Sequence, residues 1–79
     1  MKVTLESTTK IVELVLADGT ICPYARLWEG TTESGVPIHA FVLRIAVAND
    51  QDHTQFDAEL LEQRPPSAAV AAIPFRLVL

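Results

Sequence analysis

Residues 11–29, IVELVLADGTICPYARLWE, decide the fold of this chain. Asp18-Gly19 stands between two apolar runs, and this dipeptide readily adopts the positive backbone angles that a tight hairpin needs. The first run, Ile11–Leu16, is β-branched and apolar around a single charge, which predicts a strand covered on both faces. Residues 20–29 form the returning strand. Pro23 predicts an edge or a bulge there, because proline has no N–H to donate.

Further strands are expected on both sides of this hairpin. Residues 2–6 alternate between polar and apolar, which predicts a short strand. Residues 30–35 are polar and predict a loop, after which residues 37–48 predict the longest strand, apolar and covered on both faces. The alternation over residues 74–79 predicts a last strand.

One helix is expected between the polar break at residues 49–53 and Pro65-Pro66, because the residue before a proline avoids helical angles. A capping box could form from Asp52 with Gln55 or from Thr54 with Asp57. An apolar stripe is predicted to face inward and consists of Phe56, Leu60 and Leu61. Ser67 is expected to cap a single helical turn over residues 68–72.

The fold class predicted from these elements is α+β, in one domain spanning residues 1–79. We expect a small, mostly antiparallel sheet or a partly open barrel of about five strands, with one short helix before the last strand. A single helix covers little of such a sheet. The sheet should therefore either curl into a barrel or leave an apolar face for another chain.

Composition narrows the function classes. The 79 residues are 49% apolar and carry ten acids against six bases, a net charge of −4. Excess acid argues against direct binding to nucleic acid or to an anionic membrane. No signal peptide and no membrane-spanning run is visible, and the single cysteine fits a reducing compartment, so we expect a cytoplasmic protein. So short a chain needs help to be stable, which favours a protein partner or a homo-oligomer such as a homodimer.

No catalytic or metal-binding constellation is evident, and we expect a non-enzymatic protein without cofactor or metal. Cys22 precedes a proline in an apolar strand, with no Lys, Arg or helix N-terminus beside it to activate the thiol, which favours an inert cysteine. His39 and His53 lie far apart in the sequence. Residues 50–54 begin like a calcium loop, but Gln55 replaces its glycine and Leu61 its bidentate glutamate.

Two groups of residues are candidates for protein binding. Tyr24, Arg26 and Trp28 share one face of a strand and belong to the residue types enriched at interface hot spots. The alternative for them is core packing combined with a cation–π ladder. The helix carries Asp57, Glu59 and Glu62, which either form a solvated face or recognise a basic partner.

The leading functional hypothesis is a non-enzymatic protein-interaction module. A narrower form is a small acidic inhibitor or accessory protein that docks on a nucleic-acid-handling complex. The analogy is with phage proteins that inhibit bacterial CRISPR effectors, and it rests on size and charge alone, because those proteins share no motif. The alternative is a self-assembling β domain whose homo-oligomer forms a ligand pocket or a minor enzymatic site. Direct nucleic-acid binding through Arg26, Trp28 and Arg44 is a third hypothesis, which the net charge opposes.

Overall fold

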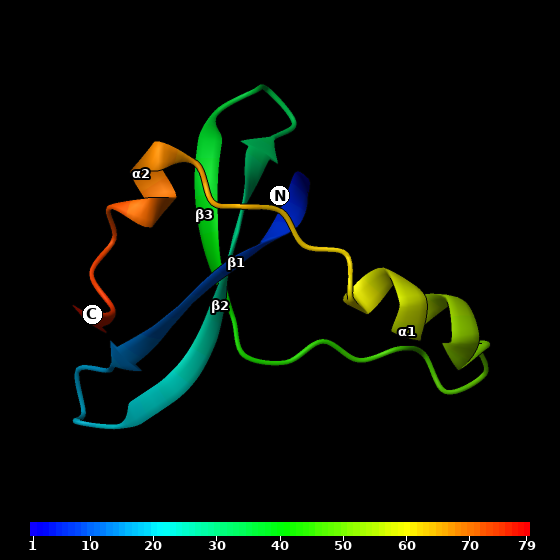
Figure 1. Cartoon of the computed structure of the whole chain (residues 1–79), viewed down its shortest axis with the longest axis horizontal. Coiled ribbons are helices and arrows are strands. Elements are labelled where there is room, and N and C mark those ends of the chain that lie inside the picture. Colours follow the sequence, from blue (N-terminus) through cyan, green and yellow to red (C-terminus); the bar gives the residue numbers. More distant parts are fainter.

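The computed structural model describes residues 1–79 and has the predicted α+β class (Figure 1). Four strands form one open sheet in the order β3-β2-β1-β4. The elements are β1 (Val3–Val15), β2 (Ile21–Thr32), β3 (Pro37–Val42), α1 (His53–Leu60), α2 (Ala68–Ala71) and β4 (Arg76–Val78).

The hairpin between β1 and β2 forms at the predicted dipeptide. Gly19 has a φ of +89°, and the Leu16 N–H donates to the Thr20 carbonyl at 2.8 Å. The Asp18 carboxylate accepts from the Thr20 N–H at 2.9 Å, which lowers the pKa of Asp18. The strands that flank this turn are longer than predicted.

The prediction of about five strands is corrected to four. The segments 2–6 and Ile11–Leu16, expected as separate strands, are joined in the single strand β1, which begins at Val3 and ends at Val15. Residues 30–32, expected in a loop, continue β2. The expected loop glycine, Gly30, packs so closely against β1 that a Cβ there would collide with the Thr4 carbonyl.

Two irregularities in the pairing of β1 with β2 keep one face of the sheet apolar. β2 has one extra residue between Cys22 and Ala25, so the irregularity predicted at Pro23 is a bulge. β1 has two extra residues between Ser7 and Ile11. The two extra residues leave the alternation of faces along β1 unchanged. The single extra residue in β2 shifts the alternation there, so that Cys22 and Ala25 both lie on the core face.

The third predicted strand is much shorter than expected. β3 ends at Val42, paired with Arg26, and residues 43–48 leave the sheet. Extending β3 would require pairing with the bulged part of β2, where Pro23 lacks an N–H. The expected cover on both faces is also wrong, because Leu43 is 53% exposed and Ile45 is 49% exposed.

The last strand makes the sheet mixed. β4 pairs parallel with β1, whereas the pairs β1–β2 and β2–β3 are antiparallel. A salt bridge of 3.4 Å joins Arg76 of β4 to Glu13 of β1. The sheet is open, so the barrel alternative is wrong and the prediction of a mostly antiparallel sheet holds only roughly.

The core lies on one face of the sheet. The predicted turn is α2, and its N-cap residue Ser67 accepts from the Val70 N–H. Val70 of α2 packs on the sheet, with Ile73 and Leu77 beside it. The buried hydrophobic residues are Val12, Leu14, Ala25, Leu27 and Val70. The opposite face of the sheet has no such cover.

Helix α1 is present but does not pack as predicted. Its N-cap is Asp52, whose carboxylate accepts from the Thr54 N–H at 2.8 Å and has a lowered pKa in consequence. No residue of α1 is buried, and Leu61 just after it is 81% exposed, so the predicted inward stripe is wrong. Two connecting segments carry α1 to one end of the molecule, away from the core (Figure 1). Neither helix is long and apolar enough to cross a membrane.

Candidate protein-binding surface

The alternation of β2 places Tyr24, Arg26 and Trp28 on the face opposite the core. Tyr24 is 78% exposed, whereas Arg26 and Trp28 are half-buried. The alternative of a cation–π ladder is not formed, because the cation–π contact in this structure joins Lys10 to Phe75 at 4.2 Å. The Arg26 guanidinium instead donates to the backbone carbonyl of Thr8 at 2.9 Å. Arg26 therefore supports the irregular part of β1 as well as lining the surface.

Trp28 lies beside a groove with mostly apolar walls. The groove has a volume of about 430 Å³ and runs between the sheet, the segment that follows β3 and the end of α1. We call it the apolar groove; its lining residues are Ser7, Arg26, Trp28, Leu43, Ile45, Leu60, Leu61 and Gln63. Three leucines and one isoleucine that were expected to be covered thus form part of an open surface: Leu43, Ile45, Leu60 and Leu61.

A second groove, which shares Trp28 with the apolar groove, is acidic. Its volume is about 540 Å³. We call it the acidic groove; its lining residues are Leu5, Glu6, Ser7, Trp28, Glu59, Glu62, Gln63 and Arg64. The residues that line the two grooves are together called the Trp28 surface. Arg26, Trp28, Glu59 and Glu62 of the predicted site belong to it, whereas Tyr24 and Asp57 line neither groove.

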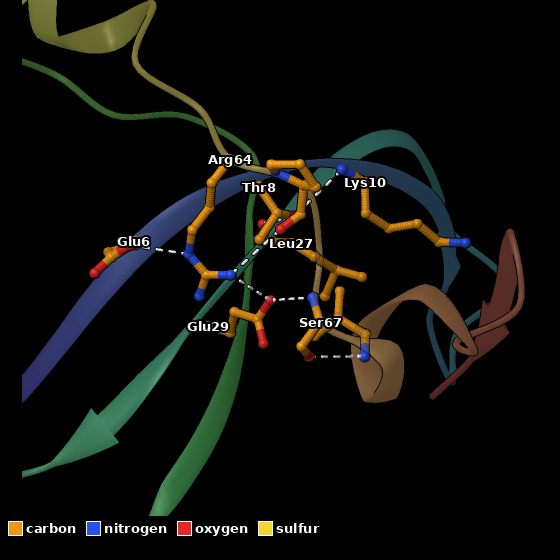
Figure 2. Close-up of polar contacts among 9 residues, drawn as sticks. Glu6, Thr8, Lys10, Leu27, Glu29, Arg64 and Ser67 are labelled. Atoms are coloured by element: carbon orange, nitrogen blue, oxygen red, sulfur yellow. Dashed lines mark hydrogen bonds and ion pairs between the residues drawn. The ribbon is translucent and has the colours of Figure 1, made fainter.

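One wall of the acidic groove is fixed to the sheet by Arg64. Its backbone N–H donates to the Ser7 carbonyl at 3.2 Å, and its carbonyl accepts from the Thr9 N–H at 3.0 Å. The guanidinium lies between two carboxylates, with Nε 2.9 Å from Glu6 Oε2 and Nη1 3.1 Å from Glu29 Oε2 (Figure 2). The chain that leads from α1 to α2 is therefore tied to both long strands.

The carboxylate of Glu29 has a second partner on the same oxygen. The backbone N–H of Ser67 donates to Oε2 at 2.8 Å (Figure 2). This hydrogen bond is the main reason why the pKa of Glu29 lies below its ordinary value, and the Arg64 charge lowers it further against the opposing effect of burial. Glu29 is 8% exposed and stays ionised at neutral pH.

Sequence reasoning missed Glu29 and Arg64. The available signal was the pattern of β2, in which Glu29 follows Ala25 and Leu27 on the buried face. A buried carboxylate requires a partner, but nothing local identified Arg64, which lies 35 residues further along the chain. Leu43 and Ile45, in the segment after β3, also line the surface. Their apolar side chains are evident in the sequence, but the pattern there predicts a covered strand.

The residues considered for reaction chemistry lie apart from this surface. Cys22 is half-buried and packs against the core. His39 is in β3 and His53 begins α1. No three His, Cys, Asp or Glu side chains gather in a group that could hold a metal ion.

The Trp28 surface combines an aromatic side chain, an apolar wall and an acidic wall. Such an arrangement can bind a protein that presents apolar side chains next to basic ones. Comparison of the chain with protein-family models, with curated proteins and with solved structures found no match.

Proposed function

We propose that this protein is a non-enzymatic protein-interaction module that binds a partly basic protein through the Trp28 surface. The observation that carries the proposal is the position of Trp28, half-buried between the apolar and the acidic groove. Tryptophan is the residue type most enriched at interface hot spots, and such residues act from pockets that the partner closes to water.

The apolar groove supplies the attractive part of the proposed interaction. Leu43, Ile45 and Leu61 are about half exposed or more in the free chain. Covering such side chains contributes roughly 25 cal/mol for each Å² of apolar surface removed from water. A partner with apolar side chains of its own would fit here.

The acidic groove supplies selectivity for a basic partner. Glu6 is paired with Arg64, whereas the side chains of Glu59 and Glu62 form no salt bridge. Free carboxylates beside an apolar groove attract basic proteins from a distance and disfavour acidic ones.

The narrower form of the proposal is a small acidic inhibitor or accessory protein for a nucleic-acid-handling complex. Proteins that hold nucleic acid carry lysine and arginine on the surface that contacts the phosphates. A chain with a net charge of −4 and free carboxylates beside Trp28 complements such a surface.

The test is binding of the purified wild type and Trp28→Ala to the same partner. The partner is captured from host extract on immobilised wild type, purified, and measured by titration calorimetry. Trp28→Ala is expected to lose at least about 2 kcal/mol of binding free energy, a roughly thirty-fold weaker Kd. Val36→Ala is the matched control, since Val36 is exposed and apolar but lies outside both grooves.

Circular dichroism verifies that each variant is folded. If Trp28→Ala unfolds, Leu61→Ser replaces it, because Leu61 is almost fully exposed in the free chain. The proposal is wrong if the folded surface variant binds as tightly as wild type, if Val36→Ala weakens binding equally, or if wild type retains no protein.

A further inference from the structure

The segment that follows β3 has the sequence of a strand but no partner within the chain. Residues 43–48, LRIAVA, alternate and are rich in apolar side chains. No backbone or side-chain hydrogen bond involves any of residues 43–47, and Ala48 makes a single bond, accepting from the Gln51 N–H. Its backbone donors and acceptors are therefore available to another strand.

The strand that leads into this segment is itself an open edge. β3 pairs with β2 on one side and has no neighbour on the other. The Thr32 N–H donates to the Val36 carbonyl, and antiparallel pairing then alternates along the strand. His39 and Phe41 therefore direct their N–H and C=O groups away from β2. β4, at the opposite edge, is only three residues long.

Charge distinguishes this edge from the rest of the molecule. All ten acids lie outside residues 34–49, and Arg44 is the only Lys or Arg within them. A basic partner would find no counter-charge along this edge. A second copy of the chain, which also carries a net charge of −4, could approach here without bringing acids together.

The surface area of the chain is too large for a monomer of its size. Its accessible surface is 5854 Å². A typical monomer of 8.6 kDa exposes about 4,700 Å². The excess of roughly 1,200 Å² exceeds the ~800 Å² that each partner buries in an interface of standard size. One two-fold contact would thus bring the exposed area of each chain into the usual range.

We infer that two copies of this chain pair antiparallel through the edge of β3 and its extension, residues 43–48. The pairing is isologous about a two-fold axis and joins two four-stranded sheets into one continuous sheet. It uses backbone groups at the edge of the sheet, whereas the Trp28 surface uses side chains on one face. The two proposals can therefore fail separately.

The test uses Val47→Pro, with Val47→Ala as its matched control. Continued along the extension, the alternation of β3 directs the Val47 N–H to the same side as those of His39 and Phe41, toward the proposed partner. Val47 has a negative φ and its N–H makes no hydrogen bond, so proline leaves every hydrogen bond of the monomer in place. In a paired strand the same proline removes a donor and blocks the partner. Light scattering after size exclusion is expected to give twice the chain mass for wild type and Val47→Ala, and the chain mass for Val47→Pro.

A second measurement needs no variant. Hydrogen exchange of wild type is expected to show protection at Leu43, Ile45 and Val47, whose N–H groups face the partner, and this protection should increase with protein concentration. The inference is overturned if wild type has the chain mass at every concentration, if Val47→Pro stays dimeric, or if Leu43, Ile45 and Val47 exchange equally fast at low and high concentration. A monomeric wild type that still binds a partner through Trp28 would overturn this inference alone.

Discussion

Glu29 holds together parts of the chain that meet only in the folded state. Its carboxylate oxygen accepts from Ser67 and from Arg64, and Arg64 also contacts Glu6. An unfolded chain offers none of these partners to the carboxylate. The lowered pKa of Glu29 is therefore a measure of how much the fold favours its ionised form.

Stability should depend on the charge of Glu29. Because its pKa is lower in the folded than in the unfolded chain, ionised Glu29 stabilises the fold above its ordinary pKa, and this stabilisation is lost as the pH falls through the lowered pKa. We expect Glu29→Gln to be less stable than wild type at neutral pH. Its Tm should also fall less on acidification, measured by calorimetry over the acid range.

The control for this prediction is Glu33→Gln, at an exposed glutamate whose side chain forms no salt bridge. It should lose stability on acidification as wild type does. Asp18 and Asp52, whose pKa values are also lowered, are present in every variant, so the difference isolates Glu29. Equal acid sensitivity of Glu29→Gln and wild type would contradict this account.

Helix α1 is the element that the fold supports least. It has eight residues and buries none of them. Isolated helices shorter than ~12 residues are only marginally stable in water, and most helices in proteins are stabilised by packing. The carboxylates of α1 are consequently exposed, and under the proposed function their effect is expected on the rate of association rather than on the stability of the core.

The proposed function predicts different effects for two carboxylates of α1. Glu59 lines the acidic groove and Asp57 does not, although both are exposed. Glu59→Lys is expected to lower the association rate constant for the basic partner by about tenfold at low salt, with a smaller effect at high salt. Asp57→Lys makes the same change in net charge and should have a smaller effect. Equal stopped-flow rates for the two variants would show that only net charge matters.

Three features whose signals lie within a few residues are confirmed. The hairpin at Asp18-Gly19, the irregularity at Pro23 (predicted as an edge or a bulge and found as a bulge) and the cap at Ser67 each depend on local backbone chemistry. The end of β3 depends instead on where its neighbour bulges, and this is invisible in residues 43–48 themselves. The position of α1 depends on its connecting segments, so its apolar stripe was assigned to a core that it never reaches.

The whole molecule is expanded for its length. Its radius of gyration is 13.9 Å. A compact domain of this length has a radius of about 11.6 Å. Only seven of 79 residues are buried, because the sheet is covered on one face and α1 stands apart. So little buried surface gives limited stability to a chain of this length. This is the physical reason for expecting a partner or a second copy.

If two copies pair as inferred, the stability of the molecule must depend on its concentration. A partner that binds only the folded chain stabilises it by mass action. We expect the Tm of wild type to rise with protein concentration in calorimetry, and that of Val47→Pro to stay constant. A wild-type Tm that does not change over a hundred-fold dilution would contradict the pairing.

Trp28 is the only tryptophan in the chain, and it lies at the boundary between the two grooves. An indole that is half in contact with water emits at a wavelength that depends on that contact. Any occupant of either groove must change the hydration of this ring. The intrinsic emission of the unlabelled protein is thus an optical signal for the occupation of its own candidate binding surface.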